Sequence, residues 1–384
     1  MTERLRVLLL IPHLGGGGAE KVTALLARGL SREKYELHLG LMTQAEGAGA
    51  VLPGVTVHGL GAARVRAGAL GLLRLVWRLR PGVILSNMAH LNFLVLLLRP
   101  LFPRGTRVLV RQNGTVSAAL AFAGRPALTR HLYRLLYPRA DRVICQSRAM
   151  AADLTGELGI DPKLIAVLPN PLDEEGIRAA RNAPSLWAGG GPHLLSVGRL
   201  SDEKGLDLLL EALAAIRRRF PQADLVVVGE GPRRAQLEEQ RRRLGLEAAV
   251  SFAGQLGSPY LYYPGASLFV LSSRHEGLPN ALLEALTAGL PVAAAPASGG
   301  VVDLLRKCPG AWLAAEISAP ALAQTLAAAL EGLPPGQRFV RRFGRESEIA
   351  APPQSAREPA GEFEFTRAFE AYEAQIDALG KVRP

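Results

Sequence analysis

The chain has 384 residues, enough for two domains of ordinary size, and its 48% hydrophobic and 21% charged residues exclude a disordered chain. Its formal net charge of +11 is unevenly placed: residues 1–187 hold 24 Lys and Arg against 12 Asp and Glu, whereas residues 188–384 hold 21 against 22. Cys145 and Cys308 have no metal-ligand spacing, so we expect two buried thiols in a reducing cytosol.

Two apolar runs near the start of the chain are too short or too polar to be membrane anchors. RVLLLIP, from Arg6, is seven residues long and runs into glycines, which is typical of a buried first strand. The run VILSNMAHLNFLVLLLRPLF, from Val83, includes Asn87, His90 and Arg99, and is too polar for a spanning helix. We therefore expect a cytoplasmic protein that is soluble or peripheral on a membrane.

Short apolar runs alternate with helical periodicity along the chain. The runs typical of buried parallel strands are 7–11, 83–85, 108–110, 143–145 and 165–168, with helices over 19–29 and 125–136. The composition changes at NAPSLWAGGGPH, residues 182–193, and the alternation then restarts. The second half predicts strands at 194–197, 225–228 and 268–271 and helices at 206–218 and 233–244.

This alternation predicts an α/β protein of two doubly wound, Rossmann-like domains, over residues 1–175 and 188–345. Residues 334–359 are rich in Arg, Pro and Ser and predict a surface loop. A helix is expected within residues 358–380, because Phe365, Phe369, Tyr372 and Ile376 recur at helical spacing. Its packing partner is left open.

The stretch HEGLPNALLEALTAGLPVA, residues 275–293, places two acids eight positions apart around the start of a helix. Pro279 and Asn280 fit the first turn, and Gly289 and Pro291 end the helix. Free backbone N–H groups over residues 278–282 are expected to attract an anion. Glu276 and Glu284 would then accept hydrogen bonds from hydroxyls on either side of that anion, and a diphosphate between two sugars has this layout.

A second stretch, VGRLSDEKGL at residues 197–206, places two cations at another junction of strand and helix. Arg199 and Lys204 are five positions apart and would lean over the same strand ends. Together they would neutralise a diphosphate without a metal ion. The chain contains no Asp-x-Asp, and we expect no metal site. A third stretch, VVVGEGP at residues 226–232, would let backbone approach a flat ligand such as a nucleobase.

In order and spacing, these three stretches resemble the signature of family 4 glycosyltransferases over roughly residues 5–310. The resemblance implies a GT-B fold, in which two Rossmann-like domains face a cleft, and a retaining, metal-independent transfer from a UDP- or GDP-linked sugar with no cofactor. It implies that Arg199 and Lys204 grip the donor diphosphate and that Glu276 is a catalytic residue at the transferred sugar, beside Gly277, Leu278, Pro279 and Asn280. Glu284 would hold the ribose, and Glu230 and Gln255 would lie near the base.

The first half also fits the family, which often has Gly-Gly-Ala-Glu after its first strand. Here IPHLGGGGAEKV supplies that motif, and the resemblance implies a loop for phosphate and acceptor at Gly16, Gly17 and Gly18. SNMAHLN, residues 86–92, resembles the family's Ser-His-Met-x-His-x-Asn. His90 matches the second histidine, near the reacting carbon, whereas Asn87 stands in place of the first. A dinucleotide fingerprint is excluded, because the glycines do not have the G-x-G-x-x-G form.

Between Glu46 and Asp141 the chain has thirteen arginines and no acid. The segments 66–82 and 125–139 are amphipathic and basic, which is typical of helices that lie on a membrane, although helices that cover a sheet are also amphipathic. We hypothesise that residues 64–139 bind an anionic membrane surface and that the acceptor is a lipid-linked or oligosaccharide glycan.

Three other functions are compatible with part of the sequence. A nucleic-acid binder is suggested by charge alone, but the basic interval lacks interleaved aromatic residues, so we expect no nucleic-acid partner. A GT-B-fold sugar-nucleotide epimerase is disfavoured by the pairing of R-x4-K with E-x7-E. A non-catalytic subunit that binds nucleotide sugars remains an alternative.

Overall fold

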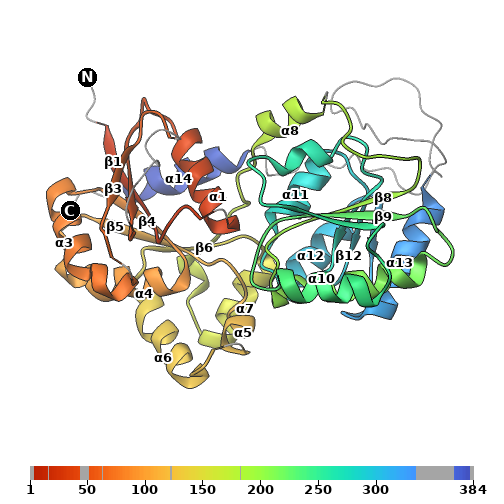
Figure 1. The fold of residues 1–384 in the computed structure, drawn as a ribbon. Helices are drawn as coiled ribbons and strands as arrows, with labels where there is room; N and C mark the ends of the chain where they lie inside the picture. Colours follow the sequence, from red (N-terminus) through yellow and green to blue (C-terminus); the bar gives the residue numbers. More distant parts are fainter. Residues whose placement is uncertain are drawn as a thin grey trace. The chain divides into compact units, whose positions relative to one another are not determined.

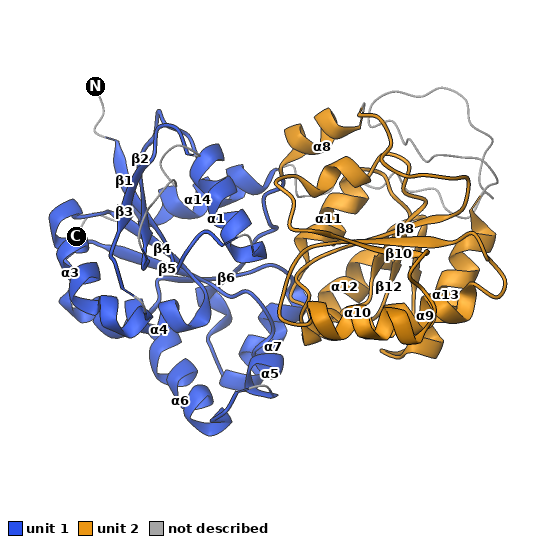
Figure 2. Ribbon diagram, viewed as in Figure 1, with its two compact units in different colours: residues 1–172, 364–384 blue, residues 173–363 orange. Residues whose placement is uncertain are grey.

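The computed structural model describes residues 4–15, 17–43, 52–62, 64–121, 123–181, 183–333 and 367–380. The chain forms two compact units, coloured separately in Figure 2. Unit 1 consists of residues 1–172 and 364–384, and unit 2 consists of residues 173–363. The chain therefore builds most of unit 1, then all of unit 2, and returns to unit 1 for its last helix.

Unit 1 contains a sheet of seven parallel strands in the order β3-β2-β1-β4-β5-β6-β7 (Figure 1). The strands are β1 Leu5–Ile11, β2 Tyr35–Leu41, β3 Thr56–Gly59, β4 Val83–Asn87, β5 Arg107–Arg111, β6 Arg142–Cys145 and β7 Ile165–Val167. Helices cover both faces of the sheet, so the central strands are apolar on both sides. This explains why β4 is buried along its whole length and β1 from Val7 onwards, with no alternation of buried and exposed positions.

Two sets of helices cover the faces of this sheet. The helices are α1 Gly18–Gly29, α3 Ala69–Leu79, α4 Ala89–Leu98, α5 Val116–Ala121, α6 Pro126–Leu136, α7 Arg148–Leu158 and α14 Ala368–Gly380. Helices α3, α4, α6 and α7 pack against one face, where they share a hydrophobic core with Leu8 and Val110. Helices α1 and α14 share the opposite core with Leu9 and Leu85.

The C-terminal helix α14 packs against the first sheet. Tyr372 and Ile376 are fully buried in the core that α1 also lines. At the helix surface, the Lys34 ammonium lies 2.7 Å from a carboxylate oxygen of Glu373. The sequence predicted this helix but not its partner. Phe365, which we expected on its apolar face, lies outside the described residues, as does the whole loop expected over 334–359.

Unit 2 contains six parallel strands in the order β10-β9-β8-β11-β12-β13. The strands are β8 His193–Val197, β9 Asp224–Val228, β10 Val250–Gly254, β11 Leu268–Leu271, β12 Val292–Ala294 and β13 Ala311–Leu313. The helices are α8 Glu174–Ala180, α9 Leu206–Ile216, α10 Arg234–Arg243, α11 Asn280–Thr287, α12 Gly299–Leu305 and α13 Ala319–Gly332. Two hydrophobic cores, one on each face, hold the helices to the sheet.

Each sheet has one point at which the strand order reverses. In unit 1 this point lies between β1 and β4, and in unit 2 it lies between β8 and β11. Open parallel sheets bind ligands beyond the carboxyl ends of the strands at such a point. The residues that follow these four strands are therefore the first place to look for a site.

Candidate active site

In unit 2, the two motifs with paired charges follow the two strands at the reversal point. The run Gly198–Lys204 leaves β8, and the run Ser272–Glu276 leaves β11. Strands β8 and β11 are parallel neighbours, with Leu268 beside Leu194. Their carboxyl ends therefore meet at one edge, and motifs about seventy positions apart in the sequence become adjacent.

The adjacency produces a direct ion pair between the two motifs. The Lys204 ammonium lies 2.6 Å from Oε1 of Glu276, and the same oxygen accepts a hydrogen bond from the Ser273 hydroxyl at 2.7 Å. The Lys204 side chain is 24% exposed and that of Glu276 is 11% exposed. A cation and an acceptor oxygen are thus held together at the edge of the sheet, partly shielded from solvent.

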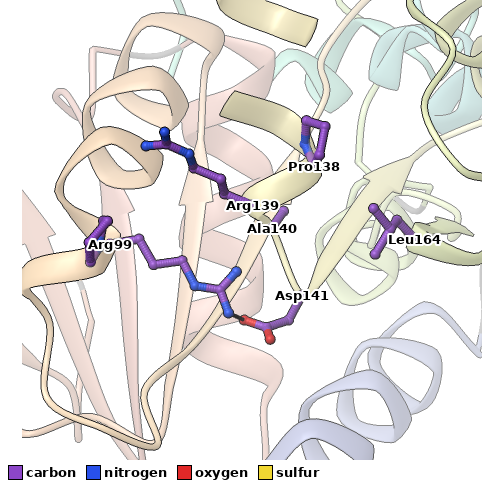
Figure 3. A pocket seen from close by; sticks show the side chains of 7 residues that line it. Arg99, Pro138, Arg139, Ala140, Asp141 and Leu164 are labelled. Carbon is purple, nitrogen blue, oxygen red and sulfur yellow. Dashed lines mark ion pairs between the residues drawn. The ribbon is translucent and has the colours of Figure 1, made fainter. Parts of the chain in front are cut away.

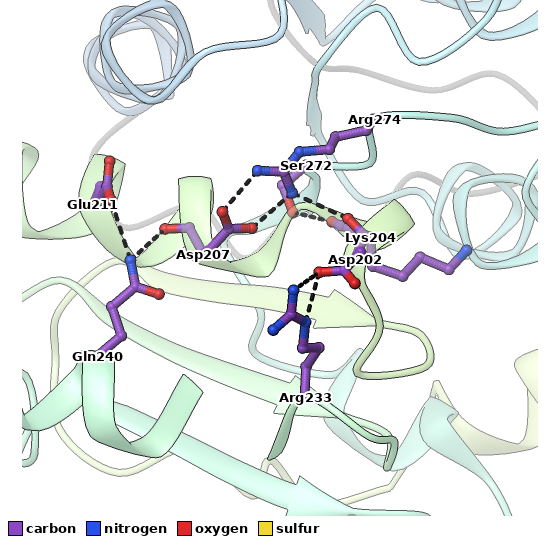
Figure 4. Close-up of polar contacts among 8 residues, drawn as sticks. All are labelled: Asp202, Lys204, Asp207, Glu211, Arg233, Gln240, Ser272 and Arg274. Atoms are coloured by element: carbon purple, nitrogen blue, oxygen red, sulfur yellow. Dashed lines mark hydrogen bonds and ion pairs between the residues drawn. The ribbon is translucent and has the colours of Figure 1, made fainter. Parts of the chain in front are cut away.

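The turn that carries Lys204 is held by the segment after β11 (Figure 4). This turn is the short helix η5, Asp202–Lys204, and the Ser272 hydroxyl donates to the Lys204 carbonyl at 2.8 Å. Gly205 follows with φ of +58°, and a Cβ there would collide with the Ser272 carbonyl. Only glycine allows this approach, so the "KG" of the motif is required by the packing of the turn.

Arg274 connects the same segment to helix α9. Its guanidinium donates two parallel hydrogen bonds of 2.7 Å to the carboxylate of Asp207, in the first turn of α9. The Arg274 guanidinium holds the pKa of Asp207 below its ordinary value, mainly through these hydrogen bonds. Figure 4 shows this cluster, with the Lys204 side chain pointing away from it.

The loop before α11 leads into the helix at the expected place, but its backbone N–H groups differ from our expectation. Helix α11 begins at Asn280 with Pro279 as its N-cap residue, and the Glu276 N–H donates to the carbonyl of Ala297 at 3.2 Å. We expected free N–H groups over residues 278–282, and this was wrong at two positions, because Pro279 has no N–H and the N–H of Leu282 is bonded within the turn. The Leu282 N–H donates to the Pro279 carbonyl at 3.2 Å, because that turn tightens at the helix start.

The second acid of the motif, Glu284, is buried inside unit 2. It is 2% exposed and lies on the second turn of α11. Tyr260 and Tyr263 are also buried, and burial raises the pKa of both hydroxyls, with the negative charge of Glu284 raising them further. Glu284 therefore faces two phenol groups, and its role at the ribose stays a prediction.

The other predicted donor-side residues are more exposed. Arg199 is exposed, with no ion-pair partner in the described part of the chain. Glu230 lies 2.7 Å from the Arg234 guanidinium, which anchors it at the start of α10. Gln255 is exposed directly after β10. Because Gly229 and Gly254 form a bridge, Glu230 and Gln255 follow two neighbouring strand ends.

In unit 1, the glycine loop after β1 leads into helix α1. Gly17 is the N-cap residue of α1, and a Cβ there would collide with the carboxylate of Glu20. Gly18 is the first residue of the helix, whereas Gly16 lies outside the described residues. Glu20 is buried, with its carboxylate 3.6 Å from Nδ1 of His13. The Gly-Gly-Ala-Glu motif thus folds its acid back onto its own loop.

His90 is the second residue of α4, directly beyond the carboxyl end of β4. Its pKa is lowered, first by desolvation and second by the charge of His13. Met88, two residues earlier, has φ of +77°, which is a rare backbone conformation for a residue with a long side chain. Such strain occurs where a strand end must aim a particular side chain.

Asn87, which stands where the family has its first histidine, is fully buried. Its amide donates to the Thr23 hydroxyl at 3.0 Å and to the Ala19 carbonyl at 3.3 Å. Asn87 therefore ties the end of β4 to helix α1 rather than facing solvent, and an imidazole role at this position is not available to it.

Arg111 is a buried cation at the carboxyl end of β5. Its guanidinium donates to four uncharged oxygens from four segments: the Tyr372 hydroxyl at 3.2 Å and the side-chain carbonyls of Asn87, Asn113 and Asn170. It is 3% exposed, so one of the thirteen arginines that we expected on the basic surface belongs to the interior instead.

Sequence reasoning missed His13 and Arg274. His13 follows β1 as His90 follows β4, and β1 pairs with β4, so the same strand-end argument that selected His90 would have selected His13. Arg274 lies inside the quoted motif, but its pairing with Asp207 depends on the adjacency of two turns. Within the described ranges, no group of three His, Cys, Asp or Glu side chains has an arrangement that could hold a metal ion.

Comparisons with known proteins agree with this geometry over both units. Residues 16–175 match the family described as Glycosyltransferase Family 4, and residues 178–344 match the family described as Glycosyl transferases group 1. The chain is 30% identical over 307 residues to N-acetylgalactosamine-N,N'-diacetylbacillosaminyl-diphospho-undecaprenol 4-alpha-N-acetylgalactosaminyltransferase of Campylobacter jejuni, covering 77% of this chain and 82% of that protein. The chain is a family 4 glycosyltransferase.

Other relatives of this glycosyltransferase extend over a similar share of the chain. The amylovoran biosynthesis glycosyltransferase AmsD of Erwinia amylovora is 23% identical over 303 residues, which is 78% of this chain and 84% of AmsD. Among solved structures, HepE of Anabaena in complex with UDP and glucose has a TM-score of 0.70 at 21% identity, covering 86% of this chain and 90% of HepE. This likeness shows the GT-B fold.

Two further sequence predictions concern the glycosyltransferase as a whole. Both cysteines are free and buried, as expected, and burial raises the pKa of Cys145 to about 12 and that of Cys308 to about 11. Across the described residues, no helix combines the length and the apolar character that a membrane crossing requires.

Proposed function

We propose that this glycosyltransferase moves a hexose or N-acetylhexosamine from a UDP- or GDP-linked donor to a lipid-linked glycan acceptor, with retention at the anomeric carbon and without a metal ion. The observation that carries the proposal is the 2.6 Å contact between Lys204 and Glu276. It brings a cation for a phosphate and an acceptor for sugar hydroxyls to the reversal point of one sheet, where such ligands bind.

The donor diphosphate would compete with Glu276 for the Lys204 ammonium. Arg199, exposed and without an acid partner in the described chain, supplies a second cation for the same group. Two cations stabilise the charge that develops on a departing diphosphate, which is the largest electrostatic demand of the reaction. Glu276, released from Lys204, would then accept hydrogen bonds from the transferred sugar.

Retention and independence from metal rest on the resemblance to the family. In that scheme the bond between the anomeric carbon and the donor phosphate breaks, a bond from the acceptor oxygen forms on the same face, and the acceptor proton passes to the departing phosphate. His90, with a lowered pKa, would stand near the reacting carbon as a neutral imidazole at pH 7.

The acceptor class is supported by the relatives and by the surface of unit 1. The C. jejuni relative is named for a diphospho-undecaprenol acceptor. Helices α3, α4 and α6 cover the same face of the first sheet (Figure 1). Large apolar side chains on these helices, together with Leu101 shortly after α4, are exposed. We call this set the outer apolar face: Leu70, Trp77, Leu97, Leu101, Leu128 and Leu135.

Exposed arginines lie on the same segments of the chain as the outer apolar face. Arg66, Arg74, Arg78 and Arg134 are exposed on the same helices or immediately before them. A nearby hollow of about 700 Å³ is lined by Arg99, Arg139 and Leu164, with Arg99 paired to Asp141 at 2.6 Å (Figure 3). Apolar side chains among cations match the interface of an anionic leaflet, where each basic residue contributes about 1 kcal/mol.

The donor proposal is tested by a thermal-shift screen with UDP, GDP, ADP and their sugar derivatives in EDTA, on wild type and Lys204→Ala. One nucleotide should stabilise the wild type by about 1 kcal/mol or more at saturating concentration, with a smaller effect in the variant. Stabilisation that appears only when EDTA is replaced by Mg²⁺ or Mn²⁺ would contradict the proposal that no metal ion is needed. If none of these nucleotides stabilises the wild type, the protein does not use these donors.

The transfer itself is tested with the donor that binds and a polyprenyl-diphosphate glycan. A new glycosidic product whose anomeric configuration matches the donor, observed by NMR, supports retention. Release of free sugar from the donor, or epimerisation of the donor sugar, without any acceptor product would favour the epimerase alternative. Binding without turnover over a panel of acceptors would favour a non-catalytic subunit.

The membrane proposal is tested by co-sedimentation with phosphatidylglycerol-rich and phosphatidylcholine vesicles. We expect binding to the anionic vesicles only, reduced in the double variant Leu70→Ser with Trp77→Ala. Leu186→Ser is the matched control, because Leu186 is an exposed apolar residue of unit 2. Equal binding to both vesicle types, or none, contradicts the proposal.

A further inference from the structure

The turn that carries Lys204 is bound by the segment after β11 through three consecutive carbonyl groups. The Arg274 guanidinium donates to the Asp202 carbonyl at 3.0 Å, and the Arg274 N–H donates to the Glu203 carbonyl at 2.7 Å. The Ser272 hydroxyl donates to the Lys204 carbonyl at 2.8 Å. All three carbonyls of η5 are therefore fixed by residues that lie within four positions of Glu276.

The Arg274 side chain is itself fixed by Asp207. Two parallel hydrogen bonds of 2.7 Å join the planar guanidinium to the carboxylate, so Arg274 can neither rotate nor slide without losing one of them. Asp207 belongs to α9, and the buried Gln240 of α10 donates to its carbonyl at 3.1 Å. The position of Arg274 is thereby set by two packed helices (Figure 4).

We infer that Arg274 and Asp207 form a positioning pair that sets the Lys204 ammonium relative to Glu276. The inference rests on the proposed role of Lys204 and Glu276 at the donor. Arg274 holds the turn that carries Lys204, and it also lies two positions before Glu276 in the chain. The pair therefore fixes both charged groups from one anchor, and neither member need touch the donor.

If the pair served only to stabilise the fold, its loss would change unfolding; a positioning role instead changes ligand binding. Asp207 and Arg274 are partly exposed, and such ion pairs contribute little to overall stability. Loss of the pair should thus leave the fold intact while the turn shifts. A displacement of a binding group by a fraction of an ångström weakens its interactions steeply, so the effect should appear in ligand binding and not in unfolding.

The first experiment measures nucleotide binding in Arg274→Gln, Arg274→Lys and Asp207→Asn, with UDP, GDP and ADP as probes. We expect each variant to bind the preferred nucleotide about tenfold more weakly than wild type at an unchanged melting temperature. Lysine should not rescue, because a point charge cannot make the two parallel hydrogen bonds. The double variant Arg274→Gln with Asp207→Asn should be no weaker than either single variant.

Arg233→Gln is the matched control. Arg233 contacts the Asp202 side chain on the exposed side of the same turn, through a single surface carboxylate. Its loss removes an arginine–aspartate contact from η5 without releasing any of the three carbonyl groups. We expect nucleotide affinity close to wild type, and a loss equal to that of Arg274→Gln would overturn the inference.

The second experiment needs no nucleotide and so separates the inference from the proposed function. Pulsed acetylation with mass spectrometry measures how readily the Lys204 amine reacts, with the exposed Lys307 as internal reference. In Arg274→Gln the reactivity of Lys204 should rise several-fold, towards that of Glu276→Gln, in which the amine has lost its partner. Reactivity equal to wild type would show that the pair does not position Lys204, whatever the nucleotide screen gives.

Discussion

The Lys204 ammonium and the Glu276 carboxylate lie 2.6 Å apart, although 72 positions separate them in the chain. The contact links the cation proposed for the donor phosphate to the acid proposed for the transferred sugar. Glu276 therefore competes with the donor phosphate for Lys204, and Lys204 competes with the sugar hydroxyls for Glu276. This competition has a measurable consequence.

Glu276→Gln should separate binding from turnover. The variant removes the negative charge that neutralises Lys204, so UDP or GDP should bind at least as tightly as to wild type. Transfer should fall by about a hundredfold or more, because the charged acceptor at the sugar is lost. Isothermal titration and product assays measure the two effects. Weaker nucleotide binding in Glu276→Gln would argue that Glu276 contacts the nucleotide itself.

Glu284→Gln tests the proposed ribose contact of a buried acid. If Glu284 accepts a hydrogen bond from a ribose hydroxyl, wild type should discriminate against 2′-deoxy-UDP, and the variant should bind both nucleotides equally weakly. A hydrogen bond to a charged acceptor is worth about 1.5–3 kcal/mol, so discrimination of tenfold or more is expected. Discrimination that persists in Glu284→Gln would assign the acid to Tyr260 and Tyr263 alone.

Unit 1 should lose stability as the pH falls below 6.5, the ordinary pKa of histidine. The pKa values of His38, His58 and His90 are all lowered, mainly by desolvation. The unfolded chain therefore takes up protons first, and stability is lost between pH 6.5 and the lower pKa values of the folded state.

The pair of His38 and His58 is the clearest part of this effect. Their ring nitrogens lie 3.1 Å apart, and the Arg78 guanidinium lies 3.3 Å from the other nitrogen of His58. Melting temperatures between pH 7.5 and 5.5 should fall less steeply in His58→Gln than in wild type. His131→Gln, at an exposed position of α6, should keep the wild-type slope. An unchanged slope in His58→Gln would show that the pair does not contribute.

Tyr372→Phe should destabilise unit 1 through the buried Arg111. The variant removes one of four neutral acceptors of a guanidinium that has no carboxylate partner in its hydrogen-bond set. The expected cost is about 1–3 kcal/mol in urea unfolding, since a buried charged donor loses its acceptor. Lys34→Gln, which breaks the contact between the exposed Lys34 and Glu373 of the same helix, should be close to neutral. Equal effects of the two changes would contradict this account.

Local signals in the sequence were sufficient to predict most strands and helices of unit 2 and to place the R-x4-K and E-x7-E motifs at strand ends. Strand β11 is a continuous apolar run and β8 has an apolar pair at its centre, and Gly205 and Pro279 mark the junctions that follow them. Given parallel strands and a reversal point, the adjacency of R-x4-K and E-x7-E follows from topology. The family comparison confirmed the fold and the enzyme class.

Contacts between distant segments were beyond the reach of the sequence. Strand β3 has no fully buried residue and so lacks an apolar run. Helix α14 has a clear apolar stripe, but a stripe does not specify which core it covers. The burial of Arg111 could not be separated from the twelve other arginines of its interval, because burial depends on four oxygens from four segments.

The return of the chain to unit 1 has a practical consequence for protein engineering. Gly380, at the end of α14, lies against the side chain of Leu5 at the start of β1, so the two ends of the described chain are neighbours. A gene that stops after residue 172 would encode a first unit without the hydroxyl that Arg111 uses. A circular permutant that joins these ends through a short linker, with its new ends in a surface loop, would keep α14 and therefore the whole of unit 1.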